Sequence, residues 1–336
     1  MLKVGLLGAG RIATVHAKAI TAHRKSTLVA VSDMIAENAK QLAANFGCEV
    51  RTTDEIIGDP TIDAVLIATS TDTHSDLIER ATAAGKAVLC EKPVDLSLER
   101  ARACQAAVAQ SGRPVMIGFN RRFDPNFSAV KAALAGGEIG KAELLSITSF
   151  DPSPPPVSYI KVSGGLFRDM MIHDFDMATF IMGEAPVSIS AVGSSIVDPE
   201  IGIAGDVDTA VVTMTYADGK IAVIKNSRRA VYGYDQRLEL LGSEGLLQAQ
   251  NMLENTMVKS TVAGVTGAKP TYFFLERYMP AYEAEWAAFV EAVETKSAFP
   301  VTLEDGVTAL AMAEAANRSL EFGRAVLLEE VAPVLA

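Results

Sequence analysis

The sequence predicts an α/β domain followed by an α+β domain, on three observations. The chain has 336 residues, more than one hydrophobic core usually organises, so two domains are expected. Residues 1–120 alternate continuous apolar runs with helical patterns, as in a parallel sheet covered on both faces. Residues 141–262 instead carry strand-like runs joined by short turns, which favours antiparallel pairing. We therefore expect a doubly wound parallel sheet in residues 1–120 and an open, mostly antiparallel sheet plus helices in residues 121–336.

In the first domain, strand and helix patterns alternate along the whole segment. The expected strands are Leu2–Leu7, Leu28–Ser32, Ala64–Thr69, Ala87–Cys90 and Val115–Phe119. The expected helices lie near Ile12–His23, Ala36–Phe46, Ser75–Ala84 and Ser97–Gln110. Strands separated by helices in this way are predicted to pair in parallel.

In the second domain, the strand-like runs follow one another more directly. The expected strands are Glu143–Phe150, Val187–Val197, Thr209–Tyr216, Ile221–Asn226 and Gln236–Leu241. Ala217-Asp218-Gly219 is a typical turn between two of them. One helix is expected near residues 165–182, and two more close the chain near Pro280–Thr295 and Leu303–Phe322.

The composition excludes several classes of protein. A net charge of −11 has the wrong sign for a nucleic-acid binder. No stretch approaches the roughly 18 uninterrupted apolar residues of a membrane span. The N-terminus contains glycines and charged residues, which is not typical of a signal peptide. Cys48, Cys90 and Cys104 are odd in number and scattered, which indicates reduced thiols. We expect a soluble cytoplasmic protein with neither nucleic-acid nor membrane partners.

The first expected strand leads directly into Gly8-Ala9-Gly10-Arg11-Ile12-Ala13, and a helix pattern follows. Gly8 permits the tight turn, Gly10 leaves room for a pyrophosphate, and Ala13 lets helix and strand pack closely. The backbone N–H groups at the helix start then face the phosphate charge. Glycines in this context predict a Rossmann dinucleotide-binding domain.

An acidic residue is expected about 20 residues further on, at the end of the second strand, and Asp33 lies there. Its carboxylate would accept hydrogen bonds from the adenosine ribose and repel a 2′-phosphate. Because Met34 follows in place of an arginine, the sequence predicts NAD over NADP. The further candidates for cofactor binding are Arg11, Ile12, Thr69, His74, Glu91 and Lys92.

Cys90-Glu91-Lys92-Pro93 follows the strand Ala87–Cys90 directly. Ligands of open α/β sheets bind beyond the carboxyl ends of the strands, so Lys92 is expected in the cofactor crevice. By position alone, an ordinary surface lysine is the more common interpretation, and the pairing with the acidic and histidine residues of the helix near residues 165–182 reverses it.

Asp169, His173 and Asp176 lie at i, i+4 and i+7 of the expected helix, which would place them on one face. The residues around them are strongly apolar, and burying such groups carries a desolvation cost that a structural role rarely explains. A structural core histidine is the alternative. No two of the four histidines show metal-ligand spacing, so we expect no metal, and His173 is the candidate to accept an alcohol proton.

Several of these stretches together resemble one family. They are Gly8–Ala13, Glu91-Lys92-Pro93, Gly118-Phe119-Asn120-Arg121-Arg122 and Asp169-x-x-x-His173. In this order they are similar to the glucose–fructose oxidoreductase/inositol dehydrogenase/MocA family over essentially the whole chain. The stretches 228–235 and 276–285 resemble the inositol 2-dehydrogenases within that family.

The resemblance implies a fold, an activity and a set of site residues. The fold is a Rossmann domain plus an open-faced sheet used in tetramer formation, so a homotetramer is expected. The activity is NAD-dependent oxidation of myo-inositol at C2 to 2-keto-myo-inositol (scyllo-inosose). The implied catalytic residues are Lys92, Asp169 and His173. The implied substrate-binding residues are Asn120, Arg121, Asp176, Tyr234 and Tyr282.

Other functions stay open at this point. The nearest is the same chemistry on scyllo- or D-chiro-inositol or on a sugar, since an inverted hydroxyl is distinguished by geometry and not by residue type. A catalytically silent NAD-sensing regulator would be expected to lose the lysine or the histidine, and both are present. If the chain were a structural or binding module, the expected burial of Asp169, His173 and Asp176 on one helix face would have no explanation.

Overall fold

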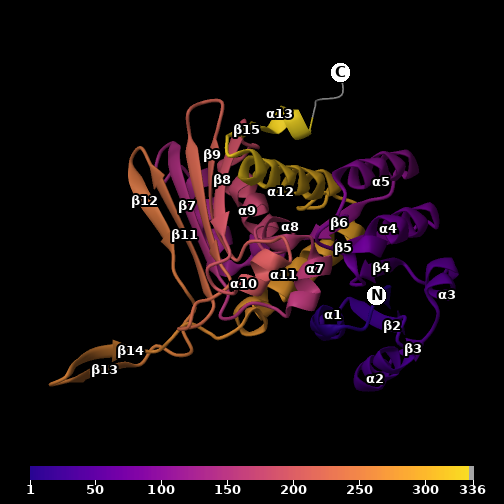
Figure 1. Ribbon diagram of the computed structural model, residues 1–336. Helices are drawn as coiled ribbons and strands as arrows, with labels where there is room; N and C mark the ends of the chain where they lie inside the picture. Colours follow the sequence, from indigo (N-terminus) through magenta and orange to yellow (C-terminus); the bar gives the residue numbers. More distant parts are fainter. Residues whose placement is uncertain (333–336) are drawn as a thin grey trace. The chain divides into compact units, whose positions relative to one another are not determined.

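The computed structural model describes residues 1–332, which form two compact units. The first unit contains Met1–Phe123 and Met279–Leu310. The second contains Asp124–Tyr278 and the chain from Ala311 onward. Each unit has its own sheet and its own buried core (Figure 1).

The sheet of the first unit has six strands in the order β3-β2-β1-β4-β5-β6. Every neighbouring pair is parallel. The strands are β1 (Leu2–Leu7), β2 (Ser26–Ser32), β3 (Glu49–Val50), β4 (Ala64–Ile67), β5 (Ala87–Glu91) and β6 (Val115–Gly118). The strand order reverses direction next to β1, which is where ligands bind in doubly wound sheets.

Helices follow the strands of this sheet in alternation. They are α1 (Arg11–Ala22), α2 (Ala36–Phe46), α3 (Thr53–Gly58), η1 (Thr71–Thr73), α4 (His74–Ala83), α5 (Leu98–Ser111) and η2 (Asn120–Phe123). The four residues of β4 are all buried, as a parallel strand covered on both faces requires. The prediction of a doubly wound parallel sheet is confirmed.

The second unit contains a mixed sheet in the order β12-β11-β7-β10-β9-β8-β15. Only the β7–β10 pair is parallel among the neighbours of this sheet. Its strands are β7 (Ala142–Phe150), β8 (Ser188–Ser194), β9 (Thr209–Thr215), β10 (Ile221–Ser227), β11 (Asp235–Gly242), β12 (Gly245–Ala249) and β15 (Val326–Leu327). The mostly antiparallel sheet is therefore confirmed.

Helices cover only one face of this sheet. Residues of β9 alternate between buried and exposed positions, as expected for a sheet with one face in contact with solvent. The helices are α6 (Pro125–Ala135), α7 (Val157–Ser163), α8 (Gly165–Asp169), α9 (Ile172–Met182), α10 (Pro199–Ile203) and α13 (Leu328–Val331). Two long helices, α11 (Phe274–Thr295) and α12 (Leu303–Phe322), contribute to both units.

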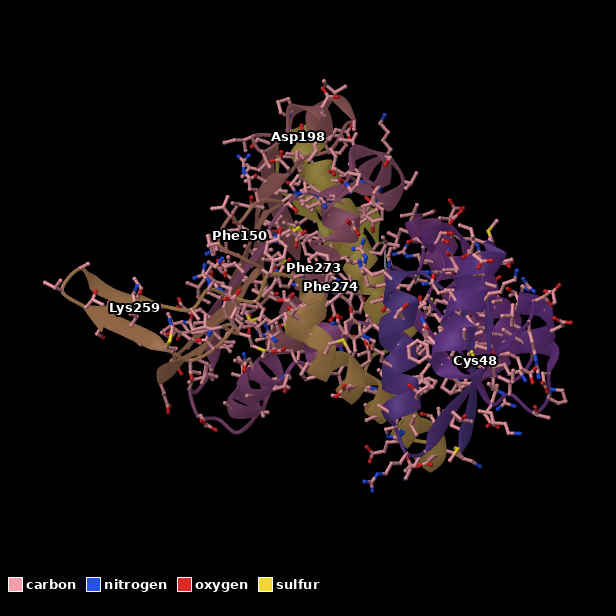
Figure 2. The ribbon with its side chains drawn as sticks, turned by 90° about the horizontal axis from the view of Figure 1, so that it is seen from below. Cys48, Phe150, Asp198, Lys259, Phe273 and Phe274 are labelled. Carbon is pink, nitrogen blue, oxygen red and sulfur yellow. The ribbon has the colours of Figure 1, made fainter. Side chains whose placement is uncertain are left out.

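A separate ribbon of two strands, β13 (Val258–Thr261) and β14 (Gly264–Gly267), extends away from the seven-stranded sheet (Figure 1). All of its residues are exposed, including Val258 and Val265. Figure 2 shows Lys259 on this ribbon.

Two features differ from the sequence expectation. The chain returns to the first unit with Met279–Leu310, so the compact units are not divided by one boundary near residue 120. The helix expected near residues 165–182 is two helices, α8 and α9, because the Met171 N–H bonds to the Leu166 carbonyl, five residues back, at 2.9 Å. That wider turn separates α8, which ends at Asp169, from α9, which begins at Ile172.

None of the helices within residues 1–332 combines the length and the apolar character that crossing a bilayer requires.

Candidate functional site

The glycine loop of the first unit has the geometry that a dinucleotide requires. Gly8 has φ +100°, and a Cβ there would lie 2.4 Å from the Ala68 carbonyl oxygen, so only glycine fits. Gly10, just before α1, has no described atom within 4 Å of where its Cβ would be. The fold itself therefore does not require glycine at this position, and the open space suits a pyrophosphate. Arg11 is exposed and Ile12 half-buried at the start of the helix.

Asp33 directly follows β2 and is held by two backbone groups. Its Oδ2 accepts a hydrogen bond from Ala9 N–H (2.7 Å), and its Oδ1 accepts one from Ile35 N–H (2.7 Å). The carboxylate is thereby fixed beside the glycine loop, and each oxygen keeps a lone pair for a ribose hydroxyl. A cavity of about 390 Å³ lies next to it. The cavity is lined by Ser32, Asp33, Met34, Ala36, Ala39, Val50, Arg51, Thr52, Thr53 and Glu55.

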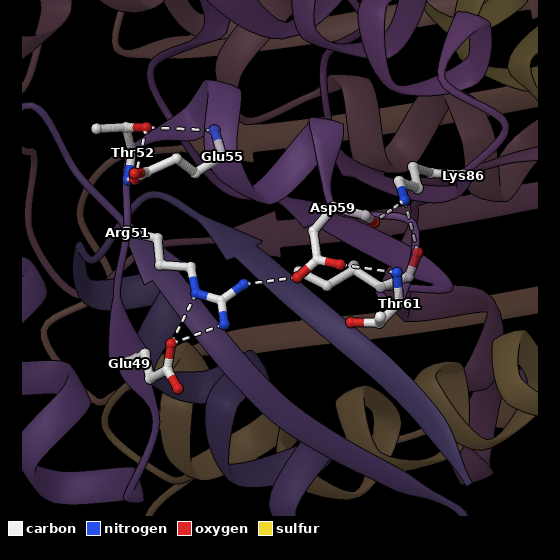
Figure 3. Close-up of polar contacts among 8 residues, drawn as sticks. Glu49, Arg51, Thr52, Glu55, Asp59, Thr61 and Lys86 are labelled. Carbon is white, nitrogen blue, oxygen red and sulfur yellow. Dashed lines mark hydrogen bonds and ion pairs between the residues drawn. The ribbon is translucent and has the colours of Figure 1, made fainter.

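The cation that lines this cavity, Arg51, is already paired. It contacts Glu49 Oε2 through Nε and Nη2, and Asp59 Oδ2 through Nη1, all at 2.7 Å (Figure 3). Hydrogen bonds from Thr61 and Arg51 lower the pKa of Asp59 to about 2, so this partner stays ionised at neutral pH. An arginine held by two carboxylates is poorly placed to bind a 2′-phosphate, which agrees with the predicted preference for NAD.

His74, at the start of α4, is buried between two loops. Its Nδ1 lies 2.8 Å from the Pro93 carbonyl oxygen, and its Nε2 lies 3.2 Å from the Thr69 carbonyl oxygen. Burial lowers the pKa of this imidazole. Because both nitrogens face backbone carbonyls, we infer that His74 supports the cofactor loops. Thr69 is half-buried, with its hydroxyl 2.7 Å from that of Thr73.

Lys92 follows β5 and is half-buried, while Glu91 before it is buried. Glu91 Oε1 lies 2.6 Å from Nε2 of His16, a fully buried residue of α1. Sequence reasoning did not select His16. Its position two turns after the glycine loop is the only signal that could have indicated it.

Three predicted substrate-binding residues belong to the first unit. Asn120 and Arg121 lie in η2 and are buried, and Tyr282 of α11 is buried as well. The Asn120 Nδ2 has no hydrogen-bond partner among residues 1–332. A buried amide donor in this state is suited to bind a ligand oxygen.

In the second unit, Asp169 ends α8 and is surrounded by partners. It accepts a hydrogen bond from the Tyr159 hydroxyl (3.0 Å), and its Oδ2 lies 3.6 Å from Nη2 of the buried Arg228. Arg228 Nη2 also lies 3.9 Å from Asp206 Oδ2. Gly165 begins this helix with φ +83°, where a Cβ would meet Asp206 Oδ1 at 2.7 Å.

His173 and Asp176 lie on α9, one turn apart, whereas Asp169 belongs to the preceding helix. The three residues therefore do not share one face of one continuous helix. His173 is half-buried and Asp176 is buried.

The carboxylate that holds α9 to the sheet is Asp174, which sequence reasoning missed. It accepts hydrogen bonds from the Ser149 hydroxyl (2.5 Å) and the Asn226 amide (2.9 Å), which come from β7 and β10. These bonds fix the orientation of the helix that carries His173. The polar pattern of the two strands could have indicated such a partner.

Tyr234 is buried in the second unit just before β11. Its ring packs edge-on against Tyr278 at 6.0 Å, and its N–H bonds to the Thr271 carbonyl. Tyr278 adjoins Arg277, which is buried and pairs with Asp124. The stretch 276–285, which resembles the inositol 2-dehydrogenases, thus contains residues that serve packing.

Within residues 1–332, no group of three or more His, Cys, Asp or Glu side chains is arranged to hold a metal ion. All three cysteines lie in this described part and are free thiols.

Comparison with known families identifies the chain. Residues 2–119 match a model described as an oxidoreductase family with an NAD-binding Rossmann fold. Residues 127–248 match the GFO/IDH/MocA C-terminal domain. The chain belongs to the GFO/IDH/MocA oxidoreductase family. The predicted family and the predicted cofactor, NAD, are thereby confirmed.

Relatives within this family are similar over nearly their full length. The chain is 51% identical to an inositol 2-dehydrogenase of Rhizobium meliloti, covering 95% of this chain and 97% of that one. It is 46% identical to a myo-inositol 2-dehydrogenase of Thermotoga maritima, covering 98% and 99%. A solved scyllo-inositol dehydrogenase of Lactobacillus casei, with bound NAD(H) and scyllo-inositol, superposes with a TM-score of 0.91 at 29% identity, covering 98% and 99%.

Proposed function

We propose that this chain is an NAD-dependent dehydrogenase that oxidises myo-inositol at C2 to 2-keto-myo-inositol (scyllo-inosose). The observation that carries the proposal is the 51% and 46% identity, over nearly the whole chain, to two proteins named as inositol 2-dehydrogenases. The presence of Lys92, Asp169 and His173 supports it, because a silent regulator would be expected to lose them.

The proposed roles follow from the chemistry of each side chain. NAD, when bound, supplies a hydride acceptor. His173 takes the proton of the reacting hydroxyl as general base. Lys92 donates a hydrogen bond to the same oxygen and stabilises its growing negative charge. Asp169, already held by Tyr159 and Arg228, orients the imidazole or binds a neighbouring hydroxyl.

A polyol presents many hydroxyls, and each one left unmatched in a dry pocket costs roughly 1–3 kcal/mol. We propose that buried polar side chains supply the partners. The residues assigned to this task are Asn120, Arg121, Asp176, Tyr234 and Tyr282. The Asn120 amide supports the assignment, because its buried Nδ2 has no partner in the described chain.

The test is a panel of polyols with NAD, followed by NADH absorbance between pH 7 and 9. We expect myo-inositol to be the best or near-best substrate by kcat/KM. The panel includes scyllo-inositol, D-chiro-inositol and aldoses, since the solved relative from Lactobacillus casei is named for scyllo-inositol. A clear preference for scyllo-inositol would replace the substrate but keep the chemistry. Activity confined to aldoses would overturn the assignment.

Cofactor choice gives a second prediction. We expect the native enzyme to prefer NAD over NADP by at least roughly 2–3 kcal/mol in kcat/KM, because Asp33 repels a 2′-phosphate and binds the ribose hydroxyls. Asp33→Ala should weaken NAD binding and narrow the gap. It should not reverse the preference, because Arg51 stays paired with Glu49 and Asp59.

Steady-state kinetics with both cofactors measures this preference. Lys40→Ala on α2 is the matched control, because Lys40 is exposed and its carboxylate partner Glu37 is exposed too. Equal kcat/KM for NAD and NADP in the native enzyme would contradict the role of Asp33.

We further propose a homotetramer that works in the cytoplasm. The open face of the second sheet supports the assembly, because Leu246, Leu241, Leu144 and Ile221 pair across four neighbouring strands and form one row. Each is between 41% and 48% exposed. Apolar rows of this kind favour burial against another copy of the chain. Three free cysteines agree with a reducing compartment.

A further inference from the structure

In the first unit, a buried pair of side chains contacts the backbone of Lys92. His16 Nε2 and Glu91 Oε1 are 2.6 Å apart, and the two residues are 0% and 7% exposed. A carboxylate so deeply buried is costly unless its oxygens accept hydrogen bonds. With the ring hydrogen on Nε2, His16 donates to Glu91 and fixes that oxygen.

The other oxygen of Glu91 faces the backbone of Lys92. Lys92 N–H donates to Glu91 Oε2 at 3.3 Å. Neighbouring β6 leaves room for the carboxylate, because Gly118 has no side chain and a Cβ there would lie 3.3 Å from both Cδ and Oε2 of Glu91. One carboxylate therefore connects the imidazole of α1 to the peptide nitrogen of Lys92.

The imidazole of His16 also contacts an aromatic ring. The Tyr282 ring of α11 meets it edge-on, with centroids 5.4 Å apart and an interplanar angle of 83°. The edge contact and the bond to Glu91 together leave the ring little freedom to rotate.

We propose that His16 and Glu91 form a positioning pair that fixes the backbone of Lys92 and thereby the location of its ammonium group. The pair touches neither the reacting atoms nor the hydride; it acts through Lys92. The inference rests on the proposed function for its kinetic consequence, since Lys92 must act on the substrate oxygen. Its structural consequence, an ordered Lys92 backbone, does not depend on any substrate.

Two amide variants of different reach test the pair. Glutamine places its amide nitrogen near the position of Nε2, whereas asparagine ends near the position of Nδ1 and cannot reach Glu91. We expect His16→Asn to lower kcat about tenfold to a hundredfold, the size of effect that small misplacement of a catalytic group produces. His16→Gln should retain most of kcat. KM for NAD should change little in both variants, because Gly8, Gly10 and Asp33 are untouched.

A double-variant cycle separates this role from a general loss of packing. If His16 acts through Glu91, then His16→Asn combined with Glu91→Ala should be no slower than Glu91→Ala alone. Ser26→Ala is the matched control, because it removes another buried hydrogen bond of the first unit, the one from Trp286 Nε1 at 2.9 Å. That control should lower the melting temperature and leave kcat unchanged.

Amide hydrogen exchange gives a readout that needs no substrate. The Lys92 amide should exchange faster in His16→Asn than in the native enzyme, and should be unchanged in Ser26→Ala. If the native enzyme oxidises no inositol, the proposed function fails. The exchange result still tests whether His16 and Glu91 fix the Lys92 backbone. Unchanged exchange at Lys92, native kcat in a folded His16→Asn enzyme, or multiplying losses in the cycle would each overturn the proposal.

Discussion

Replacing His173 by alanine is expected to lower kcat by roughly 10²–10⁴, the range that removal of a general base produces. In the proposed mechanism, the hydroxyl proton then has no side chain positioned to accept it when hydride leaves. NAD affinity should stay nearly native, because the glycine loop and Asp33 belong to the first unit and His173 to the second. Initial rates of NADH formation at saturating myo-inositol, with NAD affinity from calorimetry, measure the two quantities separately.

The matched control for this variant is His23→Ala. His23 follows α1 and is half-exposed, and its Nδ1 accepts a local hydrogen bond from Lys25 N–H at 3.3 Å. Its removal should leave kcat at the native value. If His173→Ala keeps more than about a tenth of native kcat, the proton leaves by another route and His173 is not the base.

The first unit could be predicted from the sequence because its signals are local. Gly8 is required by its own positive φ and by the Ala68 carbonyl 2.4 Å from the missing Cβ, and both belong to the strand–turn–helix motif. Asp33 directly follows the next strand and accepts a hydrogen bond from Ala9 N–H within the same motif. Spacing along the chain is therefore enough to identify these residues.

The placement of α9 against the sheet could not be predicted in the same way, because its contacts are distant in sequence. Asp174 is bound by Ser149 and Asn226, 25 and 52 residues away, and these bonds direct α9 onto the sheet. The apolar pattern of residues 165–182 continues through the break between α8 and α9, so periodicity alone indicates one helix. The contribution of α11 to the first unit could not be predicted from the sequence either, because the contact involved is distant in sequence. Trp286 Nε1 donates a hydrogen bond to Ser26, 260 residues earlier.

Asp169 shows what a residue pattern can and cannot establish about a site. The spacing to His173 selects it, and the structure gives it partners in Tyr159 and Arg228. Those partners come from a preceding helix and from the end of β10, so no local pattern contains them. Its environment, a carboxylate held beside a buried arginine, is that of a group kept in one orientation.

Lys92→Ala is expected to lower kcat by a similar factor, roughly 10²–10⁴, because in the proposed mechanism Lys92 is the cation that stabilises the developing negative charge on the substrate oxygen. Since that cation also lies in the cofactor-binding domain, KM for NAD should rise in this variant, unlike in His173→Ala. Lys25→Ala is the control, because Lys25 belongs to the same unit but is exposed and pairs with the surface residue Glu294. It should retain native kcat.

The double variant Lys92→Ala/His173→Ala decides whether the two residues act on one oxygen. Independent groups would give a loss equal to the product of the two single losses. Groups that serve one proton transfer lose most of their shared effect when either is removed, so the double variant should be little slower than the slower single variant. A fully multiplicative loss would mean that Lys92 and His173 serve different steps, and Lys92 would then be assigned to cofactor binding alone.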